Sequence, residues 1–146
     1  MKKYVLGLGL ITTLMTSCEK DNVVAPIVEQ PISKTVEFTI VPAADYSHPS
    51  YANSTAEMKL QVYKQFSNPY SVQVIWDTTI ARQPLGSFIP NTTVVKTFNG
   101  IKESEYKIGV GYSISYLNTQ FNSQSWSAMG EVIQNGNVTH KVQVGL

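Results

Sequence analysis

The chain of 146 residues is poor in the residue types from which active sites and nucleic-acid surfaces are built. It has one cysteine, Cys18, two histidines and one arginine, and only 14% of its residues are charged. Affinity for phosphate backbones comes from clustered Lys and Arg, so we expect no nucleic-acid partner. A single cysteine excludes a disulfide within the chain. We also find no motif for a cofactor and expect none.

The amino end has the three parts of an export signal. Two lysines, Lys2 and Lys3, precede an apolar run over residues 4–15, and small residues follow just before Cys18. The run is too short for a membrane-crossing helix, which needs about 20 apolar residues. A stop-transfer segment and a buried core helix are therefore the weaker interpretations. We expect residues 1–17 to be a signal peptide.

The residues around Cys18 point to a lipid anchor. A thiolate is the nucleophile that a thioether to diacylglycerol requires, and an unpaired cysteine in an exported chain needs an explanation. Residues 15–18 resemble the lipobox that the lipoprotein signal peptidase cuts. This resemblance implies cleavage before Cys18 and acylation of Cys18 with fatty acids that include palmitate. The alternative is a buried free thiol. We predict a lipid-anchored protein of the outer membrane and cell envelope.

The segment after Cys18 suggests how the domain is held. Residues 19–22 resemble the short Lys and acidic tag of surface-displayed lipoproteins of the Bacteroidota, although a solvated tether explains them equally. Pro26 and Pro31 indicate an extended segment. We expect a lipidated tether over residues 18–33 and one domain over residues 34–146, on either the cell surface or the periplasmic face.

Period-two alternation of apolar residues runs through the domain, and no window has convincing helical spacing. Core-facing strand residues are predicted at positions 36, 38 and 40, at 56, 58, 60 and 62, at 70, 72, 74 and 76, and at even positions from 106 to 116. Pro42 should end the first strand. Between Asp77 and Asn91 the alternation fails, which predicts a crossing loop packed on the core.

The remaining segments complete an all-β set. A strand of uncertain phase is expected over residues 92–98, followed by a turn at Asn99-Gly100. Residues 126–133 and 138–146 should form a hairpin about Asn135-Gly136, a dipeptide that accepts a type I′ turn. The fold class is all-β, with about seven strands in an antiparallel β-sandwich of the immunoglobulin-like or transthyretin-like kind.

Few side chains are of the types that form catalytic or metal sites. We therefore expect that the protein is not an enzyme and binds no metal ion. His140 lies in phase with apolar positions of its strand, which favours a hydrogen-bonded structural histidine. His48 lies in a loop with Asp45, but one acid and one histidine fall short of the three or four ligands of a zinc site. Thr78 lies in an Asp-Thr-Thr triplet of the kind used for O-glycosylation by Bacteroidota, although such triplets are frequent by chance.

The loop from Tyr116 to Trp126 is the best candidate for ligand binding. Aromatic rings that stack on sugars alternate there with amides that bond to hydroxyls. Tyr116 and Trp126 are also in phase with core residues, which would leave Phe121 as the only free aromatic. The candidate ligand residues are Tyr116, Asn118, Phe121, Asn122 and Trp126.

Two family resemblances accompany the strand pattern. Residues 98–110 look like the tyrosine-corner stretch of a fibronectin type III domain and residues 74–76 like its tryptophan strand, but the spacing favours an immunoglobulin-like or transthyretin-like sandwich over membership. The order of lipid cysteine, strands and Trp126 is similar to the outer-membrane lipoprotein of type VI secretion assemblies. That resemblance implies a transthyretin-like sandwich that grips a partner subunit.

Three functions remain open on these grounds. The first is a non-enzymatic envelope module that binds a protein partner or helps an assembly form, with sheet edges available for strand addition. The second is a surface lipoprotein that binds glycans through the Tyr116–Trp126 loop. The third, an enzyme, would depend on His48.

Overall fold

The computed structural model describes residues 28–146, so the predicted signal peptide, Cys18 and most of the tether lie outside the described residues. Within that range, strands alternate with turns and two single-turn 3-10 helices, η1 (Pro49–Tyr51) and η2 (Leu85–Ser87). The strands are β1 (Ile32–Val41), β2 (Ser54–Ser67), β3 (Tyr70–Pro84), β4 (Thr93–Ile101), β5 (Lys107–Asn118), β6 (Ser123–Val132) and β7 (Thr139–Gly145).

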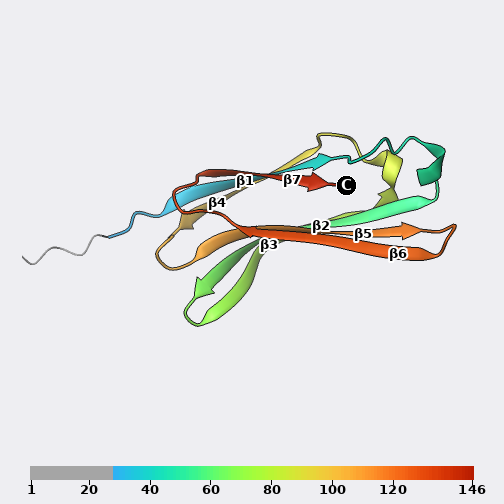
Figure 1. The fold of residues 1–146 in the computed structure, drawn as a ribbon. Helices are drawn as coiled ribbons and strands as arrows, with labels where there is room; N and C mark the ends of the chain where they lie inside the picture. The colour runs from blue at the N-terminus through green and yellow to red at the C-terminus, as the bar shows by residue number, and fades with distance from the viewer. Residues whose placement is uncertain (1–27) are drawn as a thin grey trace, which may run out of the picture.

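The strands form two sheets that pack face to face (Figure 1). One sheet has the order β4-β1-β7 and the other has the order β3-β2-β5-β6. The prediction of an all-β sandwich with about seven strands is confirmed. One pair differs from the antiparallel expectation, because β1 and β7 run parallel, from the pair Thr35–Thr139 to the pair Val41–Gly145.

The core lies between the sheets and follows the predicted alternation in three strands. The apolar faces of β1, β2 and β5 are buried, and β1 ends at Val41 just before Pro42, as predicted. Phe38 stacks on Trp76 across the two sheets, with ring centroids 6.1 Å apart. The buried apolar side chains of these strands are Val36, Phe38, Ile40, Ala56, Met58, Leu60, Val62, Ile108, Val110 and Ile114.

The predicted core face of β3 is wrong for three of its four residues. Val62 pairs with Trp76 but the next residue, Tyr63, pairs with Val74, so Ile75 is an extra residue in β3. Such a β-bulge reverses the faces of the residues beyond it. Trp76 therefore packs against the core, whereas Tyr70, Val72 and Val74 face solvent.

The predicted crossing loop begins later than expected. β3 continues through Asp77 to Pro84 as an edge strand. Its core-facing side has the polar Thr78 between Trp76 and Ile80, which interrupts the apolar alternation. The prediction that this region packs on the core holds for Leu85 and Phe88, which are buried. It fails for Ile89, which is exposed.

The predicted hairpin about Asn135-Gly136 is also wrong. Gly136 has a positive φ of 81°, so the chain does turn there. The turn, however, carries it from β6 in one sheet to β7 in the other. Asn99-Gly100 similarly lies inside β4, where Gly100 has a φ of 72° beside the register shift at Ile32 and Lys34. Local turn signals thus predicted the backbone conformation but not the pairing of the strands that follow.

A buried ion pair joins the loops at the end of the sandwich where β1 begins. Lys34 is only 2% exposed, and its Nζ lies 2.6 Å from Oε1 of Glu103 in the β4–β5 turn. The same ammonium donates to the carbonyl oxygen of Asn137 at 2.6 Å. The Glu103 carboxylate also accepts from the Gly136 amide at 2.9 Å. One lysine of β1 therefore holds two separate loops together.

The residues before β1 contact this same end. The carboxylate of Glu29 accepts hydrogen bonds from the hydroxyl and the amide of Ser104. These bonds, the hydroxyl above all, lower the pKa of Glu29. We refer to this end as the tether end. The β5–β6 turn and the residues after β1 lie at the opposite end, which we call the far end (Figure 1).

Candidate functional site

The predicted ligand loop is a tight turn at the far end. Asn118 closes β5, and its Oδ1 accepts from the amides of Gln120 and Phe121 at 3.0 and 3.1 Å. Its Nδ2 donates to the Ser54 hydroxyl at 3.0 Å. Asn122 supplies the positive φ, 47°, that the turn requires. The amide of Asn118 is thus engaged in shaping the turn.

The five candidate ligand residues do not converge on one site. Tyr116 pairs with Ser125 and faces the space between the sheets, as predicted, so Trp126 points to the outside of β6. Trp126 is 77% exposed, which contradicts its predicted core position. Phe121 is exposed at the tip of the turn, as expected. Tyr116 and Asn118 remain together, and they line a pocket.

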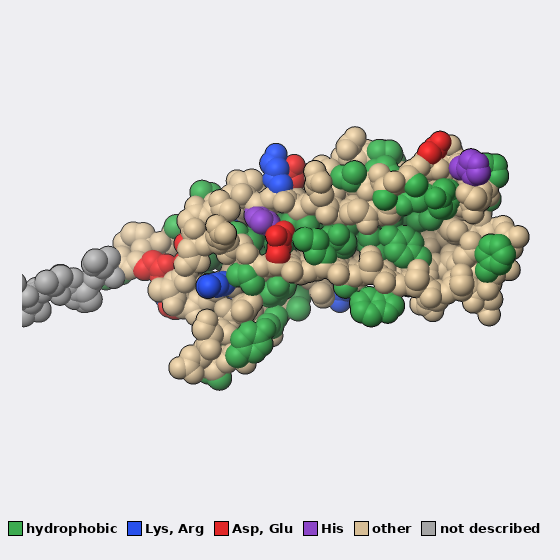
Figure 2. All heavy atoms as spheres, viewed as in Figure 1, with side chains coloured by type: hydrophobic (Ala, Val, Ile, Leu, Met, Phe, Trp, Pro, Cys, Tyr) green, Lys and Arg blue, Asp and Glu red, His purple; other side chains and the backbone are tan. Residues whose placement is uncertain are grey.

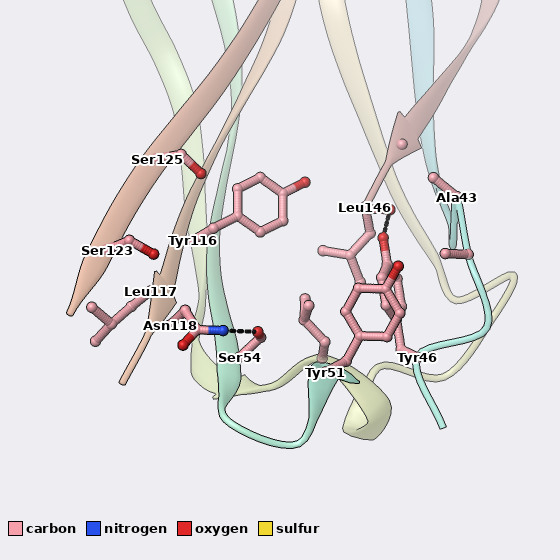
Figure 3. Close-up of a pocket in the computed structure, with 13 residues that line it drawn as sticks. Ala43, Tyr46, Tyr51, Ser54, Tyr116, Leu117, Asn118, Ser123, Ser125 and Leu146 are labelled. Atoms are coloured by element: carbon pink, nitrogen blue, oxygen red, sulfur yellow. Dashed lines mark hydrogen bonds between the residues drawn. The ribbon is translucent and has the colours of Figure 1, made fainter. Parts of the chain in front are cut away.

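That pocket lies between the two sheets at the far end and has a volume of about 590 Å³ (Figure 3). Tyr116 projects from β5 toward Tyr46 and Leu146 on the opposite side, and Ser123 and Ser125 line it from β6. Tyr51 packs edge-on against Tyr46, with ring centroids 5.0 Å apart. Burial raises the pKa of Tyr46 and of Tyr116, so both phenols are protonated at neutral pH.

The pocket opens toward the side of the sandwich where β6 extends beyond β7. The sheet β4-β1-β7 ends at β7, so the inward-facing side chains of β6 at Ser125, Ser127 and Met129 stay exposed. Figure 2 views this side and shows apolar side chains along the boundary between the sheets. Nearer the tether end, His140 of β7 bonds to Glu131 of β6 at 2.9 Å.

The structure places both histidines in ordinary structural roles. His140 is half-buried and paired with Glu131, in keeping with the structural histidine expected from its strand phase. His48 caps η1, where its Nδ1 accepts from the Ser50 amide at 3.3 Å, and Asp45 bonds to Ser47 instead. Among residues 28–146, no three His, Cys, Asp or Glu side chains gather as a metal site would require.

Two other predicted residues have contrasting placements. Thr78 lies within β3 opposite Leu60, half-buried on the core-facing side of the strand. The neighbouring Asp77 pairs with Lys59 at 2.9 Å. Cys18, the predicted lipid attachment residue, lies outside the described residues.

The sequence did not reveal the role of Tyr63, whose ring covers Gly109 on the outer face of the four-stranded sheet. Tyr63 pairs with Gly109, and a Cβ atom at that glycine would lie 2.2 Å from Cε2 of the Tyr63 ring. The ring therefore occupies the volume that a side chain would fill. The Tyr63 hydroxyl donates to the carbonyl oxygen of Glu131 at 3.3 Å. The ring is thus held flat across β5 to the backbone of β6.

Exposed apolar side chains surround this ring. Val74 is opposite Tyr63 in β3, and Val132 is opposite Gly109 in β6, so the four residues form one row across the sheet. Val72 and Val74 are 50% and 49% exposed. We call this surface the Tyr63 face; it consists of Tyr63, Tyr70, Val72, Val74 and Val132. The signal that could have revealed it is the glycine alternation at 109 and 111, which marks close approach by a neighbour.

Replacement of Gly109 by alanine should dislodge the Tyr63 ring. The new methyl group would overlap the ring, and such overpacking costs about 1–3 kcal/mol. Urea unfolding should show this loss, and the same substitution in a Tyr63→Ala background should cost much less because the overlapping ring is gone. Gly145→Ala is the control, since no heavy atom lies within 4 Å of its Cβ position. Equal costs in both backgrounds would contradict the assignment.

The chain matches no protein-family model, and neither a curated protein nor a solved structure is significantly similar to it. Over residues 28–146, no helix has the length and apolar character of a membrane-spanning segment. The Tyr63 face and the pocket are the two features of the described residues that bear on function.

Proposed function

We propose that the protein is a lipid-anchored, non-enzymatic module of the outer membrane that binds a protein partner through the Tyr63 face. The observation that carries this proposal is an apolar row that crosses a β-sheet on its solvent side. Contiguous apolar patches on the surface of a domain mark interaction sites, whereas apolar residues exposed singly are common everywhere. The β-bulge at Ile75 is what turns Val72 and Val74 outward to make this surface.

The composition of the Tyr63 face is that of a protein interface. It consists of aromatic rings and valines, and the charged Lys107 lies at its edge, opposite Gln65 in the row of Val72. Interface rims are polar in the same way. Such a rim lies beside it, where Asp77 and Lys59 form their ion pair on the outer side of the sheet. Gly109, Gly111 and Gly130 keep the surface flat between the strands. A partner with a flat apolar surface would bury this face.

The position of the Tyr63 face suits an anchored protein. It lies toward the tether end, because Lys107 opens β5 close to Gly109 and the β2–β3 hairpin projects there (Figure 1). Under the predicted anchor at Cys18, the face would lie on the membrane-proximal part of the domain. Confinement to a membrane raises the effective concentration of the protein for a partner in the same membrane.

Photo-crosslinking in the native host tests this proposal. A photoreactive residue in place of Val74 should give a defined protein adduct, and the same residue in place of Thr79 should not. Thr79 is a matched control because it is exposed on the same strand and the same side of the sheet, opposite Lys59. A photoreactive residue in place of Val132 should also give the adduct. Adding the substitution Val72→Lys to that protein should reduce the adduct tenfold or more, because the partner would bury a charge that has no counter-charge.

Three outcomes would contradict the proposal. One is the same adducts from positions 74 and 79, and another is no adduct from either. The third is crosslinking to lipid alone, which would make the membrane surface the occupant of the Tyr63 face. Protease treatment of intact cells would separately decide between the cell surface and the periplasmic face.

A further inference from the structure

The pocket at the far end is separate from the Tyr63 face, and a ligand there does not depend on the proposed protein partner. Ser54, which opens β2, lines the pocket, whereas Tyr63 lies near the other end of the same strand. The pocket also lies between the sheets, whereas the Tyr63 face is on the outside. We infer that the pocket is a binding site for an uncharged carbohydrate, with a pyranose ring held between Tyr116 and Tyr51.

The side chains of the pocket set the charge of its ligand. Every side chain that lines the pocket belongs to an apolar residue, a tyrosine, a serine, an asparagine or a glycine. A phosphate or a uronate would lose part of its hydration there without meeting a positively charged side chain, which disfavours an anionic ligand. A neutral ligand avoids this cost.

The pocket also combines aromatic ring faces with hydroxyl groups. Three tyrosines line it, with Tyr116 on one side and Tyr46 and Tyr51 on the other (Figure 3). Ser123 and Ser125 present hydroxyl groups from β6 along the edge of the space. A pyranose has a matching shape, because its C–H face packs on an aromatic ring while its hydroxyls bond at the rim.

The walls of the pocket are fixed by contacts of their own. Tyr46 is held by its hydroxyl, which donates to the backbone oxygen of Leu146, and by the edge-on contact with Tyr51. Asn118 and Ser54 bond to each other at the base of the pocket, at 3.0 Å. Walls fixed before binding lower the ordering cost of association. The volume of about 590 Å³ lies within the usual range for small-ligand sites.

The pocket differs in location from the glycan site expected from the sequence. Phe121 and Trp126 do not line it, and they lie at the turn tip and on the outer side of β6. The tyrosines that replace them come from the segment after β1, which is distant in sequence from Tyr116. The two locations make opposite predictions for the same set of variants.

The experiment applies the lipidated protein, in a detergent without a sugar headgroup, to an array of neutral and uronate-containing oligosaccharides. Binding to one or more neutral glycans is expected, with no binding to glycans made only of uronates. Tyr51→Ala and Ser125→Phe should each weaken that binding tenfold or more; Ser125 is exposed, so the phenyl ring fills the pocket without disturbing the core. Phe121→Ala and Trp126→Ala should leave it unchanged.

The array and the variants can overturn the inference in several ways. Failure of all neutral glycans to bind would remove it, as would full binding by Ser125→Phe. Loss of binding in Phe121→Ala or Trp126→Ala would return the site to the turn. None of these outcomes bears on crosslinking at position 74, so the proposed protein partner and the carbohydrate site can fail separately.

Discussion

Replacement of Cys18 by serine should abolish palmitate labelling and remove the protein from the outer-membrane fraction. Serine cannot form the thioether to diacylglycerol, and the lipoprotein signal peptidase then has no substrate, so the longer precursor should accumulate. Lipid chains contribute about 0.8 kcal/mol per buried CH₂, and stable anchoring takes more than one chain. The expected loss is therefore nearly complete. Metabolic labelling with palmitate and membrane fractionation measure it.

The Ser17→Ala variant is the matched control for this result. It changes the adjacent residue but keeps a small side chain before the cleavage site, so labelling and fractionation should match those of the unaltered protein. Palmitate incorporation by the Cys18→Ser variant would contradict the predicted anchor. Retention of the unlabelled variant in the outer membrane would show that another part of the chain attaches it there.

Replacement of Glu103 by alanine should destabilise the domain more than the Gly109→Ala substitution does. It leaves the buried Lys34 ammonium with backbone carbonyls as its only described partners and removes the acceptor of the Gly136 amide. Removal of one partner of a buried ion pair costs about 3–5 kcal/mol. For a domain of this size that corresponds to a decrease in Tm of about 10–20 °C, measurable by thermal unfolding followed by circular dichroism.

Two further variants separate the buried pair from a general effect of lost charge. Glu105→Ala removes a carboxylate from the same turn. Glu105 forms a solvent-exposed ion pair with Lys102, and exposed pairs contribute at most about 1 kcal/mol. The double variant Lys34→Met/Glu103→Leu should regain most of the lost stability, because an apolar pair no longer carries the cost of burying charge. A Glu103→Ala variant that melts within about 2 °C of the parent would refute the role of this pair.

The sequence predicted the fold class and three of the core strand faces for a simple physical reason. Where one side of a strand is buried and the other is not, as in Val36, Phe38 and Ile40, the period of two appears directly in the residue types. Where an extra residue intervenes, as at Ile75, the alternation in sequence continues but the faces exchange. The ion pair between Lys34 and Glu103 could not be predicted from the alternation, although Lys34 lies on the same face of β1 as Val36, because the two residues are far apart in the sequence.

The sites were less predictable than the strands because they are made by distant segments. Tyr116 was correctly expected to face inward, but its partners in the pocket, Tyr46 and Tyr51, come from before β2. The Tyr63 face needs the register of all four strands before Val74 and Val132 can be placed in one row. The preference of Gly136 for positive φ was readable, whereas the change of sheet that follows it depends on the whole core.

The parallel pairing of β1 with β7 has a mechanical consequence. The described residues 28–31 lead directly into β1, the central strand of its sheet, so tension applied through an anchored amino end would act along the strand axis. With a ligand held at the far end, that force would load the β1–β7 and β1–β4 hydrogen bonds in shear, many at once, rather than peel them apart singly. With the predicted anchor and the proposed ligand site, this geometry would resist extension between membrane and ligand.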